Sequence, residues 1–545
     1  MNTSILIAGG GPAGLMLALE LGTRGIECVL VEEDPDPPTF PKANLTNART
    51  MEHYRRHGFA HEVRALGLPA DHPQDVAYFT RYAKHELARL RIPSAREAAQ
   101  LPPEARGEWR TPELPHRIQQ TWIEPLLRRK VGELRSVTTR YGWRLTGFEE
   151  TAQGVTGTLE NVSTGERETT EAVYLAGCEG ARSPIRQKLG IRYTGEGGAV
   201  RDFFGGKMMT VHIKAPRLYD FINGARAWQY WAINRDRRGL LISLDGKEDF
   251  ALLVQLPDGT TASDALARDS LRLAMGVDAP VERIEIGEWT AGYALVAQRF
   301  TRGRVVLLGD SAHLFTPTGG LGYNTAVDDA ANIGWKLAAL IQGWGGPALL
   351  DSYEIERKPV AERNTGYARA MADSVGKIPM SETLEAASPE GERARREIGA
   401  RLEAHVRNEF NTAGLQLGIV YTGSPIVAEP DGPIPEQIPT RYIPTAVPGA
   451  HAPHVVLADG TPLCDRFGFE FTLLRLGGVT ASTESLHRAA TKRGVPLSVV
   501  DIAEPEARDL YERDFVLVRP DQHVAWRGNA LPDPDALLDR VTGRL

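Results

Sequence analysis

The sequence predicts an α/β fold with several domains, and three observations support this prediction. At the N-terminus, two short apolar runs (residues 4–8 and 28–33) flank a glycine-rich turn and a helical pattern. Residues 75–115 and 195–300 consist mainly of strand-like segments separated by charged turns. A proline-rich stretch later precedes a small unit of alternating strands and helices. Because a chain of 545 residues is too long to fold around a single hydrophobic core, about two to four domains are expected.

The N-terminal pattern is strand, helix, strand, which is the first unit of a doubly wound, Rossmann-like parallel sheet. Its turn carries the spacing GxGxxG directly after the strand, so backbone N–H groups at the helix start can face a diphosphate. An acidic residue ends the second strand, where a carboxylate meets an adenosine ribose. The cofactor-binding residues expected in this unit are Gly9, Gly11, Pro12, Ala13, Gly14, Glu32 and Glu33.

Charge and cysteine content exclude several classes of function. The net charge of -7 gives no reason to expect nucleic acid or an anionic membrane as a partner. Cys28, Cys178 and Cys464 are too widely separated for a CxxC pair, and no metal site is expected. The N-terminus lacks a secretory signal pattern, and no apolar run approaches the roughly 20 residues of a membrane span. These features predict a cytoplasmic protein with a small-molecule ligand.

The strand-like middle segments predict a mostly antiparallel sheet inserted between pieces of the N-terminal domain. The α/β pattern then returns with the apolar run "RVVLLGD" and the helix pattern after it. We expect residues 1–74, 116–194 and 301–375 to form the cofactor domain, 75–115 and 195–300 the substrate domain, 376–450 a helical segment and proline-rich linker, and 451–545 a C-terminal domain.

Two further motifs accompany the glycine-rich turn. In "YLAGCEGARSPIR" (residues 174–186) an apolar strand leads into Glu179 and Gly180, and "GDSAHLFTPTGGLGYN" (residues 309–324) is a second glycine-rich loop before a helix. The three motifs, in this order, resemble the signature of the single-component FAD-dependent aromatic hydroxylases, typified by p-hydroxybenzoate hydroxylase and phenol hydroxylase. The resemblance covers roughly residues 3–375 and extends more faintly to a thioredoxin-like C-terminal domain.

This resemblance implies specific contacts with FAD. Glu32 would meet the adenosine ribose, Arg49 and Gln120 the phosphate and ribityl region, and Asp310 the ribityl chain. Pro317 would lie near flavin C4a. The cofactor-binding residues that the resemblance implies in the three later segments are Arg49, Gln120, Glu179, Asp310, Pro317, Gly320, Gly322, Tyr323 and Asn324. The family usually has aspartate at Glu179, a motif that also serves the nicotinamide cofactor.

The implied reaction is hydroxylation of an electron-rich aromatic ring, of phenol or hydroxypyridine type, with NAD(P)H and O2 through a flavin C4a-hydroperoxide. NADPH is the expected reductant, although the sequence does not decide between NADPH and NADH, and the implied assembly is a homodimer. Baeyer–Villiger or ring-opening oxygenation on the same scaffold is an alternative, and a non-catalytic aromatic-binding flavoprotein is a second. A halogenase is disfavoured because "AWQYWAIN" lacks the WxWxIP spacing.

The substrate must be activated by a base or cation, because an unperturbed phenol has a pKa near 10. Asn44 stands where phenol hydroxylase carries an acid, so the ionising partner here is expected to differ. Strand alternation predicts Trp228 and Tyr230 on one face and Trp231 on the other. The catalytic candidates are Pro317, Asn44 and Tyr230, and further pocket candidates are Tyr78, Tyr82, His85, His212, Tyr219, Arg235 and Tyr293.

Overall fold

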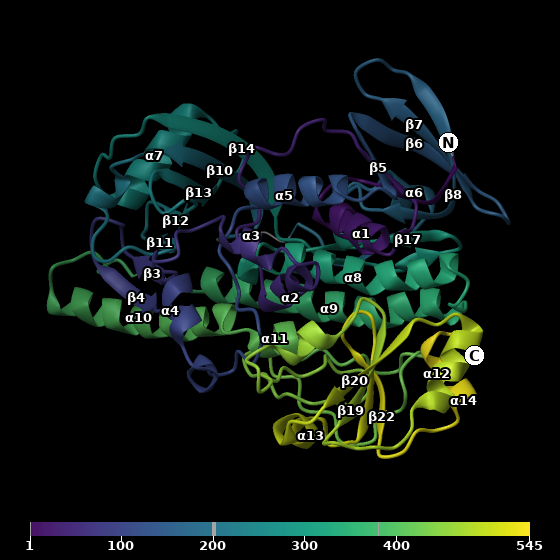
Figure 1. Cartoon of the computed structure of the whole chain (residues 1–545). Helices are drawn as coiled ribbons and strands as arrows, with labels where there is room; N and C mark the ends of the chain where they lie inside the picture. The colour runs from purple at the N-terminus through teal and green to yellow at the C-terminus, as the bar shows by residue number, and fades with distance from the viewer. Residues whose placement is uncertain (1, 199–202, 380, 545) are drawn as a thin grey trace.

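The computed structural model describes residues 2–198, 203–379 and 381–544 (Figure 1). Two sheets form the upper part of the view. Helices α8 (Leu321–Ile341) and α9 (Ala348–Gly376) run beneath them, and the C-terminal unit lies below these helices. The chain therefore folds around a central helical layer.

The first sheet contains the predicted β-α-β unit. Strands β1 (Asn2–Ala8) and β2 (Cys28–Glu32) pair in parallel, and α1 (Pro12–Thr23) connects them. Apolar residues without polar alternation form β1 because both faces of a parallel sheet are covered. The sheet order is β16-β17-β8-β1-β2-β5, extended from β8 by the β7–β6 hairpin. Its other strands are β5 (Val137–Tyr141), β6 (Trp143–Glu150), β7 (Val155–Asn161), β8 (Arg167–Gly177), β16 (Thr301–Arg302) and β17 (Val305–Leu307).

The second sheet has the order β14-β10-β13-β12-β11-β3-β4. Every neighbouring pair in it is antiparallel except β11 with β3, which is parallel. Its strands are β3 (Val76–Phe79), β4 (Glu86–Leu90), β10 (Gly206–Lys214), β11 (Gln229–Ile233), β12 (Arg238–Ser243), β13 (Asp249–Gln255) and β14 (Arg283–Ala291). A small third sheet has the order β18-β15-β9, formed by β18 (His313–Leu314), β15 (Ala294–Ala297) and β9 (Tyr193–Glu196).

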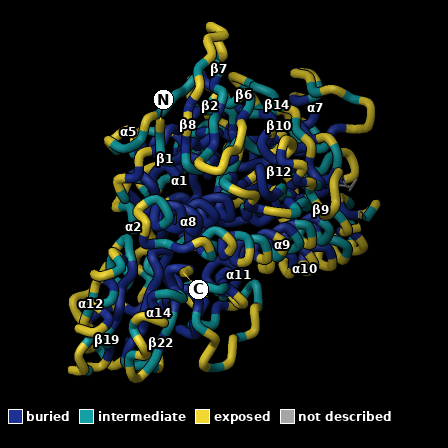
Figure 2. The backbone as a smooth tube through the Cα atoms, turned by 90° about the vertical axis from the view of Figure 1, so that its right-hand side faces the viewer, coloured by how far each residue is buried: buried dark blue, intermediate teal, exposed yellow. Residues whose placement is uncertain are grey.

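Helix α8 occupies the centre of the molecule. Figure 2 shows it as a buried stretch between the first sheet and the C-terminal unit, and most of its residues are inaccessible to solvent. It packs against α1 on one side and α9 on the other. The remaining helices of the larger part are α2 (Ala48–Arg56), α3 (Ala60–Arg64), α4 (Ala95–Gln100), α5 (Gln120–Gly132), α6 (Pro184–Lys188), α7 (Asp264–Met275), α10 (Pro389–Phe410) and α11 (Ala413–Leu417).

The C-terminal unit is a four-stranded sheet of order β20-β19-β21-β22. Its elements are β19 (Phe471–Leu476), α12 (Glu484–Arg493), β20 (Leu497–Ile502), α13 (Pro505–Tyr511), β21 (Phe515–Val518), β22 (Val524–Gly528) and α14 (Pro534–Val541). A buried ion cluster fastens this unit to the central helices: Arg519 and Lys336 each lie 2.7 Å from the carboxylate of Glu356, and all three side chains are fully buried.

The predicted α/β class, with a Rossmann-like sheet and a mostly antiparallel second sheet, is confirmed. The exact domain limits and the thioredoxin likeness of the C-terminal unit stay predictions. Among the helices of the described residues, none combines the length and apolar composition needed to cross a membrane.

Candidate active site

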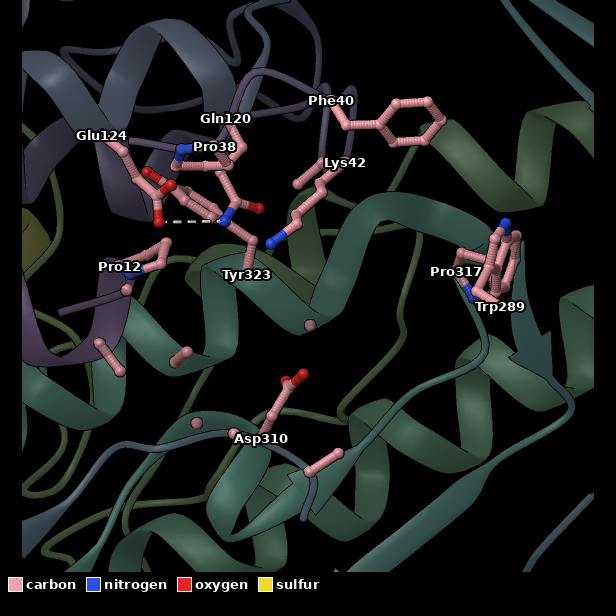
Figure 3. A pocket seen from close by; sticks show the side chains of 18 of the residues that line it. Pro12, Pro38, Phe40, Lys42, Gln120, Glu124, Trp289, Asp310, Pro317 and Tyr323 are labelled. Atoms are coloured by element: carbon pink, nitrogen blue, oxygen red, sulfur yellow. Dashed lines mark hydrogen bonds between the residues drawn. The ribbon is translucent and has the colours of Figure 1, made fainter. Parts of the chain in front are cut away.

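One large cavity runs from the glycine-rich turn after β1 to the inner face of the second sheet. Its volume is about 1410 Å³, which exceeds the roughly 300–1,000 Å³ of ordinary small-molecule pockets. The cavity therefore has room for a dinucleotide together with a second ligand. Side chains from α1, α5, α8 and the segment before α2 converge on it (Figure 3).

The turn after β1 accepts only glycine at two positions. Gly9 has φ +105°, and a Cβ there would lie 2.3 Å from the carbonyl oxygen of Cys178. A Cβ at Gly14 would lie 1.9 Å from the carbonyl oxygen of Gly9, whereas a Cβ at Gly11 would make only an ordinary contact with Glu124 Oε1 at 3.9 Å. Helix α1 then begins at Pro12 without a capping side chain. Its first-turn N–H groups are thus free for an anion, which fits a diphosphate.

Glu32 reaches back to this turn from the end of β2. Its Oε2 accepts a hydrogen bond from Gly10 N (2.5 Å), and its Oε1 accepts one from Asp34 N (3.0 Å). Both Glu32 and Glu33 line the cavity. A carboxylate held at this position fits the ribose hydroxyls of an adenosine.

Gln120 and Glu124 extend from α5 toward the middle of the cavity. Gln120 Nε2 donates to Glu124 Oε1 at 3.3 Å, and Glu124 Oε2 is buried without a hydrogen-bond partner. Burial raises the pKa of Glu124, although Lys42 acts in the opposite direction. Figure 3 shows Lys42 extending into the same space. An unpaired buried oxygen here fits a cofactor that supplies a hydroxyl donor.

Glu179 joins the turn after β8 to two other elements. Its Oε1 accepts from Ile185 N (2.9 Å), and its Oε2 accepts from the hydroxyls of Ser183 (3.0 Å) and Ser311 (3.2 Å). Burial raises its pKa, and these hydrogen bonds oppose the rise. Glu179 also lines the cavity, so it shapes the wall and ties its two loops together.

Asp310 stands on the floor of the cavity, where its side chain is exposed to the interior (Figure 3). The surrounding loop is anchored from behind. Tyr193 Oη donates to the Asp310 carbonyl (2.5 Å), and Asp329 accepts from Gly309 N (3.4 Å) and from His313 Nε2 (2.6 Å). These bonds fix the backbone while leaving the Asp310 carboxylate free for a polyol chain.

The loop that follows Asp310 ends at a second helix N-terminus that has no capping side chain. Gly319 (φ +69°) and Gly320 (φ +62°) adopt left-handed conformations, and α8 begins after Gly320 without a capping side chain. Pro317, Gly320, Gly322 and Tyr323 line the cavity. Two uncapped helix N-termini, those of α1 and α8, thus open to one cavity. The second can stabilise negative charge on a flat ring.

Aromatic side chains wall the far end of the cavity. Trp228, Trp231, Trp289 and Phe410 line it, and Trp289 Nε1 donates to Thr210 Oγ1 at 2.9 Å. Asn44 lines the cavity as well. This end is suited to an aromatic ligand.

The expected position of Tyr230 is wrong. Strand β11 begins at Gln229, so Trp228 lies before the strand and does not follow its alternation. Gln229 and Trp231 therefore face the cavity, whereas Tyr230 packs on the opposite face beside Phe79. Of the further pocket candidates, only Tyr293 lines the cavity.

Three other expected residues lie outside the cavity lining. Arg49 instead contacts Glu52 (2.9 Å) and the Gln522 side chain (2.9 Å), because its face of α2 meets the C-terminal unit. The Asn324 side chain binds the backbone of Asn47, Leu45 and Gly320, so it holds the Asn44 segment against α8. Gly14 serves close packing in the turn.

Lys42, Trp289 and Glu409 are among the cavity residues that sequence reasoning missed. Lys42 lies two residues before Asn44, so it belongs to a segment that the sequence had already marked as a candidate, and this position could have identified it. Trp289 and Glu409 come from distant elements, and only the fold brings them to the site.

Comparison with known proteins agrees with this geometry. The FAD-binding domain family model matches residues 2–368, and the C-terminal domain model of aromatic-ring hydroxylases matches residues 445–544. The FAD-dependent monooxygenase apdD of Emericella nidulans is 31% identical over 571 residues, covering 99% of this chain and 90% of that protein. The tetracenomycin B2 monooxygenase-dioxygenase of Streptomyces olivaceus is 30% identical over 575 residues, covering 99% and 98%.

Among solved structures, the rebeccamycin biosynthetic enzyme RebC with reduced flavin is 36% identical, with a TM-score of 0.89 and coverage of 100% of this chain and 99% of that one. The chain belongs to the family of FAD-dependent aromatic-ring hydroxylases, as the three motifs predicted. It is an FAD-dependent monooxygenase of aromatic substrates.

Proposed function

We propose that the enzyme uses NAD(P)H, with NADPH as the expected form, and O2 to hydroxylate a phenolic ring within a polycyclic or polyketide-type aromatic substrate. The observation that carries this proposal is the cavity of about 1410 Å³ whose far end is walled by Trp228, Trp231 and Trp289. An aromatic-walled space of this size suits fused rings better than a single small phenol. The relatives named for tetracenomycin and rebeccamycin support the same class.

The chain's own residues position the cofactor and exclude water. The turn at Gly9–Gly11 and the start of α1 would hold the diphosphate, Glu32 the ribose, and Asp310 the ribityl chain. The loop from Pro317 to Tyr323 would border the flavin ring. When bound, the flavin supplies the electron transfer from nicotinamide to dioxygen, while the protein supplies position and a dry, preorganised environment.

The test is oxidation of NADH and NADPH by the purified, FAD-loaded enzyme in the presence of small phenols, hydroxypyridines and polycyclic phenols. Peroxide release and product mass are measured together. Acceleration by the polycyclic compounds, with a product one oxygen heavier, supports the proposal, and product structure separates hydroxylation from Baeyer–Villiger insertion. Acceleration only by monocyclic compounds would contradict the substrate class. A protein that binds FAD but oxidises no nicotinamide would contradict the proposed reductant.

A further inference from the structure

Glu409 is a buried carboxylate at the aromatic end of the cavity. It lies in the last turn of α10, within residues 369–444, which neither family model matches. Its side chain is only 4% exposed, yet the residue lines the cavity together with Trp228 and its neighbour Phe410. The rings of Trp228 and Phe410 pack edge to face, 5.5 Å apart. Glu409 therefore stands at the aromatic wall.

One oxygen of the carboxylate accepts a backbone hydrogen bond, and the other is ion-paired with His405 but accepts no hydrogen bond. Oε1 accepts a hydrogen bond from Gly319 N at 3.0 Å, which ties it to the glycine-rich loop before α8. Oε2 lies 3.0 Å from His405 Nε2, but Oε2 and both ring nitrogens of His405 lack hydrogen bonds. A buried carboxylate oxygen without a donor is costly unless a ligand supplies one.

Asn44 lines the same cavity, but its amide side chain is not titratable and cannot take the proton of a ring hydroxyl. The two positions meet at one loop: a Cβ on Gly320 would touch Leu45, next to Asn44, and Gly319 binds Glu409. A carboxylate from α10 thus approaches the loop that the Asn44 segment also borders.

We propose that Glu409 is a catalytic residue that accepts the hydrogen bond, and then the proton, of the substrate's ring hydroxyl; this inference rests on the proposed hydroxylation. In the resting complex the ring hydroxyl donates a hydrogen bond to Glu409 Oε2. As the ring gives up electron density, the O–H bond breaks, its electron pair stays on the ring oxygen, and the proton bonds to Glu409 Oε2. No other reactant is needed for this transfer.

The groups that face Glu409 define its electrostatic surroundings. His405 precedes it by one turn on α10, Tyr78 faces it from β3, and Tyr367 faces it from α9. The Glu409 charge contributes to the raised pKa of both tyrosines, although their burial is the larger cause.

The test compares wild type with Glu409→Gln, which keeps an acceptor for Gly319 N but removes the charge. Glu403→Gln, an exposed position on the same helix that pairs with Arg407, is the matched control. Each FAD-loaded protein is titrated with 4-nitrophenol and with 4-nitroanisole, its methyl ether. The pH dependence of nitrophenol absorbance reports the ionisation of the bound probe.

A carboxylate beside the bound phenol disfavours the phenolate, so Glu409→Gln should increase the phenolate-to-phenol ratio at fixed pH by about tenfold or more. Glu403→Gln should match wild type, and the anisole should bind equally to all three. Equal ionisation of the bound probe in wild type and Glu409→Gln would overturn the inference. So would failure of FAD-loaded wild type to bind the phenol. A chain that takes up no FAD would instead contradict the proposed function.

Discussion

Glu179 and Ser311 are joined by a hydrogen bond of 3.2 Å, which connects the turn after β8 to the loop that carries Asp310. Ser311 Oγ also accepts from Gly180 N at 3.1 Å. The two motifs lie about 130 residues apart in sequence and act as one wall of the cofactor site. Because the contact depends on side-chain length, this wall is fitted to a glutamate at position 179.

Shortening this side chain should loosen the wall. In Glu179→Asp the carboxylate retracts by one methylene and cannot reach Ile185 N and Ser311 together. We expect a loss of about 1–3 kcal/mol in unfolding free energy and faster FAD release, measured by thermal unfolding and flavin fluorescence. Glu171→Asp, at an exposed position on β8, the strand that precedes Glu179, is the control. Unchanged FAD release in Glu179→Asp would show that the contact is dispensable.

Gly9→Ala should abolish FAD binding. Its Cβ would lie 2.3 Å from the Cys178 carbonyl oxygen at φ +105°, so the turn must shift. Gly25→Ala is the matched control, because Gly25 also has positive φ (+70°) but faces open space. We expect the control to stay yellow and to lose only about 1–2 kcal/mol. The measurement is the FAD content of purified protein, and a yellow Gly9→Ala variant would disprove the steric argument.

His116 should make stability depend on pH. Burial lowers its pKa from 6.5 to about 4, although a hydrogen bond to the Leu66 carbonyl opposes the shift. Between these values the unfolded chain binds a proton that the folded chain does not. Unfolding free energy should therefore fall as pH drops from 6.5 to 4, by up to about 3 kcal/mol from this residue.

Urea unfolding at a series of pH values tests this expectation. His116→Gln should reduce the slope of unfolding free energy against pH between pH 4 and 6.5, by an amount that corresponds to at most one proton. The same substitution at the exposed His61 should leave this slope unchanged. Because His116 pairs with Thr46 through two backbone hydrogen bonds, its protonation should also loosen the segment that carries Asn44. If unfolding free energy changes with pH equally in wild type and His116→Gln, His116 is not the source of the pH dependence.

Trp231 and Tyr230 are adjacent, but substitutions at the two positions should have different effects on ligand affinity and on stability. Tyr230→Phe removes only the hydroxyl that accepts from Ala227 N, so we expect a cost of about 1 kcal/mol and unchanged ligand affinity. Trp231→Ala opens the cavity wall and should weaken binding of polycyclic phenols, with a stability loss of about 3–5 kcal/mol. Ligand dissociation constants measured by flavin fluorescence distinguish the two. Equal weakening by both variants would contradict the assignment of faces.

The sequence predicted those parts of the molecule whose signals are local. The turn at Gly9 and the loop at Asp310 were found because closely spaced glycines directly after a buried strand form a specific short-range pattern. Tyr230 was misplaced because alternation depends on where a strand begins, and β11 begins one residue later than Trp228. Glu409 was missed because its helix reaches the cavity only through tertiary packing, for which no short-range pattern exists.

The cluster of Arg519, Glu356 and Lys336 has a consequence for recombining this protein with its relatives. Removing the C-terminal unit would leave Glu356 and Lys336 on the central helices without Arg519, and breaking a buried charge group of this kind costs about 3–5 kcal/mol. A chimera that exchanges this unit must therefore carry compatible charges at all three positions. The C-terminal unit and the central helices α8 and α9 should therefore be exchanged together as one engineering module.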